Sequence, residues 1–158
     1  MDSILIIYHS QGGIVEKMAY ALKKGIEKTN KFQVEIKNAE DASWDDLKKA
    51  KGFAVGTPDY FDYMAGTIKD FFDRTFYPSQ SKIIGSLTAN LPCVFFASGG
   101  TGGKPAIDSL TQIGKYFKFD IIDYLSVGSK LTPEILKKSE DLGEKLAASV
   151  LNGQMESN

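Results

Sequence analysis

The 158-residue sequence predicts an α/β fold of three layers, in which helices cover both faces of a doubly wound, five-stranded parallel sheet. Two observations support this fold. Segments typical of strands alternate along the whole chain with segments whose apolar residues recur at helical spacing. In addition, Ser3–Tyr8 and Pro92–Ala97 carry unbroken apolar runs, which suit parallel strands that are covered on both faces. Because no linker or repeat interrupts the alternation, we expect a single domain over residues 1–158.

The first half of the chain contains three of the expected strands. After the strand at Ser3–Tyr8, apolar residues three or four positions apart predict a helix over Ile14–Thr29. A short strand follows at Phe32–Ile36. A serine with an acid three residues later is typical of a helix cap and predicts a short helix over Ser43–Ala50. The third strand is expected at Gly52–Gly56.

The second half continues the alternation with longer connections. The expected segments are a helix that ends near Thr75, a polar connection at Tyr77–Asn90, a strand at Pro92–Ala97, a helix from Pro105 to Phe117, a strand at Asp120–Val127 and a last helix. The last helix is expected to begin at Thr132-Pro133-Glu134, because a cap residue, a first-turn proline and a first-turn acid occur there in succession. The chain therefore provides the strands and crossover helices that the fold requires.

The composition limits the classes of partner. The formal net charge is −1 at pH 7, so we expect no nucleic-acid partner. No run of about 18 apolar residues occurs, and Asp2 stands where a signal peptide has a basic flank, so we expect a cytoplasmic protein without membrane insertion. The single cysteine, Cys93, lies in an apolar run and is expected in the core. We predict no metal ligands.

Three loops leave the carboxyl ends of the predicted strands, where open parallel sheets bind ligands. Residues 9–14 place a hydroxyl, an amide and two glycines ahead of a helix, so backbone N–H groups and the helix dipole favour a phosphate there. Residues 57–66 are rich in aromatic side chains, which suit a flat apolar group. Residues 98–104 are rich in glycine, whose backbone can approach a ring edge closely. A phosphate and a planar heterocycle together indicate a nucleotide-like cofactor, and FMN fits best.

Two sets of residues resemble a known family. One resembles the flavin loop of NAD(P)H:quinone oxidoreductases of the tryptophan-repressor-binding-protein type, and it comprises Gly56-Thr57-Pro58, Phe61, Met64-Ala65-Gly66, Lys69, Phe72, Asp73 and Arg74. The other resembles the phosphate loop and first helix of the same group, and it comprises Tyr8, Ser10, Gly13, Glu16, Met18 and Ala19. Over nearly its whole length the chain resembles flavodoxin-like FMN proteins. This resemblance implies the flavodoxin-like strand order 2-1-3-4-5.

The resemblance also implies how FMN would be held. Ser10–Val15 would hold the phosphate, Thr57–Tyr63 would face the isoalloxazine ring, and Ser98–Gly102 would cover its pyrimidine edge. The predicted cofactor-binding residues are His9, Ser10, Gln11, Gly12, Gly13, Ile14, Val15, Thr57, Pro58, Asp59, Tyr60, Phe61, Tyr63, Ser98, Gly99, Gly100, Thr101 and Gly102. No catalytic side chain is predicted, because N5 of the flavin can exchange its proton with water.

The sequence leaves three functions open. The first is a redox protein that transfers electrons through noncovalent FMN to a partner protein or a small-molecule acceptor. The alternative is an NAD(P)H-dependent quinone or FMN reductase, as the second loop suggests; whether the protein is a carrier or an enzyme stays open. Residues 57–65 contain neither Gly nor Asn, at which the loop peptide of flavodoxin-type carriers flips most easily.

The third function is a flavin-free interaction module. Gly12, Ile14 and Val15 replace residues that usually carry hydroxyl groups in flavodoxin phosphate loops. We therefore expect FMN to be held more weakly than in a typical flavodoxin.

Overall fold

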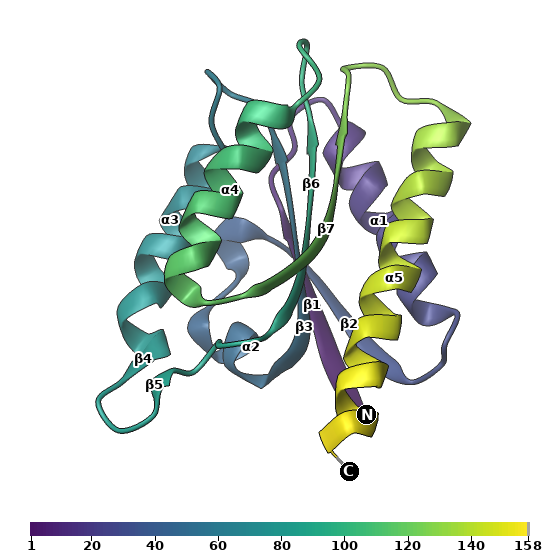
Figure 1. Ribbon diagram of the computed structural model, residues 1–158. Helices are drawn as coiled ribbons and strands as arrows, with labels where there is room; N and C mark the ends of the chain where they lie inside the picture. The colour runs from purple at the N-terminus through teal and green to yellow at the C-terminus, as the bar shows by residue number, and fades with distance from the viewer. Residues whose placement is uncertain (158) are drawn as a thin grey trace.

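The computed structural model describes residues 1–157 and contains one five-stranded parallel sheet between two layers of helices (Figure 1). The strands of this sheet are β1 (Asp2–Tyr8), β2 (Phe32–Asn38), β3 (Ala50–Pro58), β6 (Pro92–Ser98) and β7 (Asp120–Val127). Their order is β2-β1-β3-β6-β7, and every neighbouring pair is parallel. The predicted three-layer fold and its 2-1-3-4-5 strand order are therefore confirmed.

The helices cover the sheet in two groups. They are α1 (Ile14–Glu27), α2 (Trp44–Lys49), α3 (Gly66–Phe76), α4 (Lys104–Phe117) and α5 (Pro133–Ser157). Strand β1 shows why its sequence is apolar without interruption. Ile4 and Ile6 pack under α1 and α5, whereas Leu5 and Ile7 pack under the other three helices.

The predicted ends of most elements agree with the structure to within two residues. The largest difference lies in the connection 77–90, for which the sequence predicted a polar connection without any strand. It contains a short 3₁₀ turn (Tyr77–Ser79) and a small antiparallel hairpin, formed by β4 (Gln80–Ser81) and β5 (Gly85–Ser86). Such two-residue strands are too short to give an alternating sequence pattern.

Two smaller differences also have physical causes. Thr57 and Pro58 continue β3 and so extend the strand beyond Gly56, because they pair with β6. A 3₁₀ turn at Ala39–Asp41 was also missed. Within residues 1–157, no helix has both the length and the apolar character needed to span a bilayer. In the same residues, no three His, Cys, Asp or Glu side chains gather where they could hold a metal ion.

Helices α1 and α5 approach each other through two glycines. A Cβ atom on Gly25 would lie 2.0 Å from the carbonyl oxygen of Glu140, and one on Gly143 would lie 2.1 Å from the carbonyl oxygen of Leu22. These distances are far shorter than van der Waals contact. Only glycine at these two positions therefore permits the backbones of α1 and α5 to come this close. The close contact of the two helices covers the core on this face of the sheet.

We expect the substitution Gly143→Ala to lower the free energy of unfolding by about 2–3 kcal/mol, because the two helices must move apart. Gly153→Ala in the same helix is the matched control. A Cβ atom there meets nothing within 4 Å, so higher helix propensity should raise stability by about 0.5–1 kcal/mol. Urea unfolding followed by circular dichroism measures both values. Equal effects of the two substitutions would contradict this account of the helix contact.

Candidate cofactor site

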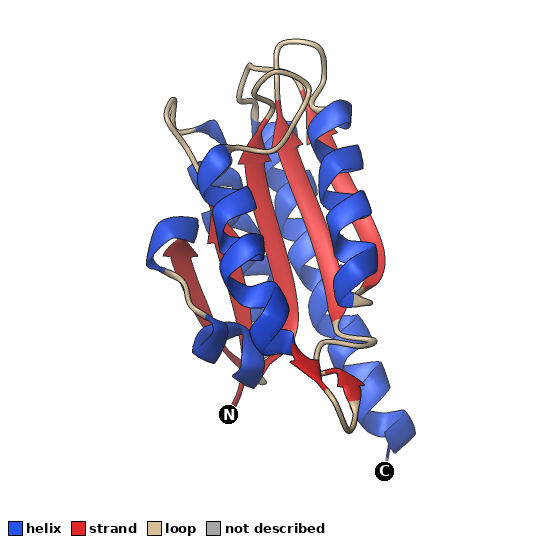
Figure 2. Cartoon of the chain, turned by 90° about the vertical axis from the view of Figure 1, so that its left-hand side faces the viewer, coloured by secondary structure: helices blue, strands red, loops and turns tan. Residues whose placement is uncertain are grey.

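A groove of about 280 Å³ lies where the loops leave the carboxyl ends of the central strands. Figure 2 shows these loops together at one end of the sheet, with the β4–β5 hairpin at the opposite end. The groove is lined by Ser10, Gln11, Gly12, Ile14, Val15, Pro58, Asp59, Tyr60, Ser98, Gly99 and Ser129. It therefore brings together residues of all three loops that the sequence singled out.

The first loop presents free backbone donors. Gly13 is the N-cap of α1 with φ of 88°, a left-handed conformation that suits glycine, and no side chain caps the helix. The hydroxyl oxygen of Ser10 accepts a hydrogen bond from the N–H of Gly13 at 3.0 Å and fixes the turn. The N–H groups of Ile14 and Val15 lie in the first helical turn, where no intrahelical acceptor exists. This end of the groove suits an anion.

His9 links the first loop to the start of α3. Its backbone N–H donates to the carbonyl of Gly56 at 3.1 Å, and its Nδ1 lies 2.8 Å from the hydroxyl of Thr67. The imidazole ring meets Tyr60 edge to face, with ring centres 5.8 Å apart. Within the described chain, the buried Nε2 atom of His9 has no hydrogen-bond partner. A buried polar atom without a partner is costly, so a ligand atom here would be stabilising.

The second loop closes in a tight turn. The N–H of Tyr60 donates to the carbonyl of Tyr63 at 2.9 Å, and the two residues between them, Phe61 and Asp62, have φ of 59° and 63°. These left-handed conformations are unusual for side chains other than Gly, Asn or Asp. The Phe61 side chain is 100% exposed. The turn therefore holds an aromatic ring in solvent, next in sequence to Tyr60, which lines the groove.

Hydrogen bonds hold the two ends of this loop in place. The hydroxyl of Thr57 donates to the carbonyl of Pro58 at 2.7 Å and accepts from the N–H of Ala65 at 2.9 Å. The N–H of Met64 donates to the hydroxyl of Ser109 in α4 at 3.0 Å. Thr57 is thus fully buried and holds the loop in place, instead of lining the groove.

The third loop packs against the second. The N–H of Asp59 donates to the carbonyl of Ser98 at 2.8 Å, and the N–H of Gly99 donates to the carbonyl of Val127 at 3.0 Å. A Cβ atom on Gly99 would lie 2.7 Å from the Cβ atom of Asp59, so glycine allows the close approach. Among the described residues, Oδ2 of Asp59 is the second buried side-chain atom without a hydrogen-bond partner.

The structure separates the predicted site residues into two groups. Those that line the groove are Ser10, Gln11, Gly12, Ile14, Val15, Pro58, Asp59, Tyr60, Ser98 and Gly99. Those outside its lining are His9, Gly13, Thr57, Phe61, Tyr63, Gly100, Thr101 and Gly102. Ser129 was missed. It lies just beyond β7, and the rule that ligands bind beyond the carboxyl ends of strands could have indicated it.

Known proteins resemble this chain in sequence and in fold. A flavodoxin from Aquifex aeolicus is 28% identical over 137 residues, which cover 84% of this chain and 71% of that protein. An NAD(P)H dehydrogenase (quinone) from Acidithiobacillus ferrooxidans is 33% identical over 95 residues, which make up 48% of each protein. The aligned segment thus spans about half of that relative.

A solved structure of a flavodoxin from the domain Archaea superimposes with a TM-score of 0.79 at 24% identity, covering 94% of this chain and 98% of that one. At this identity the likeness shows the shared fold. The family model described as flavodoxin matches residues 6–143, which is most of the chain. This protein therefore belongs to the flavodoxin family.

Proposed function

We propose that this protein transfers electrons through FMN held noncovalently in the groove between the three loops. FMN is the cofactor of the family, and when bound its isoalloxazine ring supplies one- or two-electron redox chemistry. The observation that carries the proposal is the pairing of a free helix N-terminus with two buried, unpartnered side-chain atoms beside one groove. These groups match a ligand with an anionic end and a polar heterocycle.

The first loop would hold the phosphate. The N–H groups of the first turn of α1 are its donors, and the hydroxyl of Ser10, whose oxygen already accepts from Gly13, has its own proton available to donate. Ile14 and Val15 contribute backbone donors although their side chains carry none. The phosphate would thus be bound mostly by backbone groups, as expected for weaker binding than hydroxyl-rich loops provide.

The second and third loops would hold the ring. Tyr60 offers an aromatic surface, and burial raises the pKa of its phenol, which therefore stays protonated as a donor. The free Oδ2 atom of Asp59 is an acceptor suited to a ring N–H, and the backbone at Gly99 lies close beside it. These groups would orient the ring and exclude water from the edge that they cover.

A second candidate function is an NAD(P)H-dependent quinone or FMN reductase. Two observations favour it. One is the relative named NAD(P)H dehydrogenase (quinone), and the other is the fully exposed ring of Phe61, next in sequence to the groove residue Tyr60, which would offer a contact for a second flat molecule. Electrons would then pass from NAD(P)H to a small acceptor. The acceptor, the partner protein and a cytoplasmic location remain predictions.

Replacing Gly13 by valine should weaken FMN binding by at least about tenfold, because a β-branched residue is strained by about 1–2 kcal/mol at φ of 88° and the turn must open. The obstacle is the backbone conformation, since a Cβ atom there meets nothing within 4 Å. Quenching of FMN fluorescence on titration measures the Kd. Gly153→Ala, at a glycine in α5 with open space and no positive φ, is the control that should bind FMN normally. Unchanged affinity in the Gly13 variant would exclude this loop from the phosphate site.

Replacing Asp59 by alanine should have opposite effects on stability and on binding. The apoprotein should gain about 1 kcal/mol, because a buried acceptor without a partner is removed. FMN affinity should fall by about tenfold, because the ring loses that acceptor. Thermal unfolding without FMN and fluorescence titration with FMN separate the two effects. Asp62→Asn, in the exposed turn of the same loop, should change neither. A variant with unaltered affinity would show that Asp59 does not contact the ring.

Anaerobic reduction of the FMN-loaded protein distinguishes the two candidate functions. For the carrier, stepwise addition of dithionite should convert the visible spectrum in two stages, each of one electron. For the reductase, the spectrum should change in a single two-electron stage, and NAD(P)H should reduce the flavin as dithionite does. Two stages with no response to NAD(P)H would exclude the reductase.

A further inference from the structure

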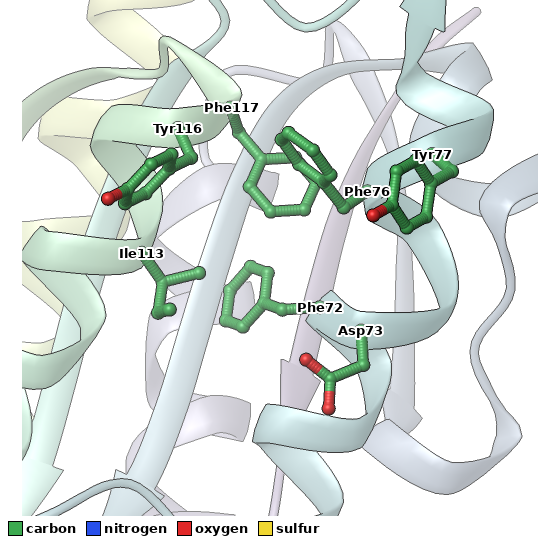
Figure 3. A pocket seen from close by; sticks show the side chains of 7 residues that line it. All are labelled: Phe72, Asp73, Phe76, Tyr77, Ile113, Tyr116 and Phe117. Carbon is green, nitrogen blue, oxygen red and sulfur yellow. The ribbon is translucent and has the colours of Figure 1, made fainter.

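A second groove, of about 370 Å³, lies far from the cofactor site, between the ends of α3 and α4 (Figure 3). Its walls are Phe72, Asp73, Phe76, Tyr77, Ile113, Tyr116 and Phe117. Tyr77 is 81% exposed and Tyr116 is 65% exposed, on opposite sides of the opening. The groove is therefore an apolar hollow with one acidic residue on its wall.

The β4–β5 hairpin next to this groove carries an apolar tip. Ile83 is 96% exposed and Ile84 is 74% exposed. The hydroxyl oxygen of Ser81 accepts hydrogen bonds from the N–H groups of both isoleucines, at 3.2 and 3.1 Å, and this defines the shape of the tip. Two large apolar side chains are thus held in solvent by a fixed turn.

Hydrogen bonds join the hairpin to the wall of the groove. The hydroxyls of Ser86 and Thr88 both donate to the carbonyl of Phe117, at 2.9 and 2.6 Å, and Phe117 is itself a wall of the groove. On the other side, Tyr77 lines the groove and begins the 3₁₀ turn that leads directly into β4. A projecting apolar tip and an apolar hollow are therefore connected neighbours on this surface.

The surface in and beside the groove carries exposed apolar side chains. The exposed apolar side chains in and beside the groove are Tyr77, Ile83, Ile84, Leu87 and Tyr116. Both isoleucines are at least 74% exposed and both tyrosines at least 65% exposed, so four large, largely apolar side chains face solvent here. Large apolar side chains that gather on the surface of a single chain mark interaction sites.

The charges on this surface are complementary to each other. Lys82, in the turn of the hairpin beside Ile83, forms no ion pair within residues 1–157. Asp73 lines the groove, and its carboxylate remains largely exposed although it pairs with Lys69 along α3. A hairpin that enters this groove from another molecule would bring its own lysine towards this acid.

We propose that two copies of this chain form a twofold-symmetric dimer, in which each inserts its hairpin tip into the groove of the other. Projection and hollow belong to one face, so a twofold axis satisfies both contacts at once. Ile83 and Ile84 fill the hollow, and Lys82 of each copy faces Asp73 of the other. The cofactor loops lie at the opposite end of the sheet and stay accessible in the dimer (Figure 1).

Sedimentation velocity over a range of protein concentrations tests the dimer. The unaltered protein should shift from monomer to dimer as concentration rises. The double substitution Ile83→Ser and Ile84→Ser should raise the dimer Kd by at least about 30-fold, the effect of losing a strong interface side chain. Both residues are exposed, so circular dichroism should show an unchanged fold. A protein that stays monomeric up to about 0.5 mM would overturn the proposal, as would a double variant that still dimerises.

A charge exchange identifies the second copy as the occupant. Lys82→Glu alone and Asp73→Lys alone should each weaken the dimer by about tenfold, because like charges meet at both symmetric contacts. An equimolar mixture of the two variants should restore it, because both contacts are then attractive. Asp141→Lys on α5 is the control. It removes an ion pair of the same i,i+4 spacing outside the proposed dimer interface, so dimerisation should be unchanged. A mixture that remains monomeric would refute the pairing of Lys82 with Asp73.

Discussion

The burial of β1 on both faces is the constraint on which the rest of the structure depends. Its four central residues are buried completely or almost completely, and the strand pairs with β2 on one side and β3 on the other. A parallel strand in this position must have its register fixed, because a shift by one residue would exchange Ile4 and Ile6 with Leu5 and Ile7 between two differently shaped layers. The register in turn sets where the strand ends.

That end determines the position of the cofactor groove. Tyr8 pairs with Gly56, and the next residue, His9, donates to the carbonyl of Gly56. The first and second loops therefore begin side by side before any loop side chain makes a contact. The third loop follows from the same register, since Pro58 pairs with Ser98 and Asp59 continues that contact. The position of the groove is thus set by the alignment of the strands. The side chains of the loops then determine its shape and its polar groups.

The sequence predicted those features that depend on neighbouring residues in the chain. It was less informative about features that depend on contacts between distant segments. Strand β1 and the turn at Gly13 could be predicted. A strand buried on both faces needs an unbroken run of apolar residues, and a tight turn before a helix favours glycine. The resemblance at Lys69–Arg74 pointed to the flavin loop, yet Arg74 donates to the carbonyls of Ala39 and Ala42 and so supports the fold. Thr57 holds the second loop through a hydrogen bond from the N–H of Ala65, and the hairpin is held by hydrogen bonds to the carbonyl of Phe117. Neither contact can be predicted from the local sequence.

The second loop shows why residue type alone is a weak guide to backbone conformation. The absence of Gly and Asn from residues 57–65 weakened the case for a peptide flip of the carrier type, yet Phe61 and Asp62 both adopt positive φ. Holding a non-glycine residue there costs on the order of 1–3 kcal/mol, and the hydrogen bonds of Tyr60, Thr57 and Met64 offset that cost. The strain is thus concentrated in two exposed residues of the turn, beyond the end of β3. The argument from composition against a carrier therefore loses its force, and the choice between carrier and reductase depends on how the loop and the flavin interact.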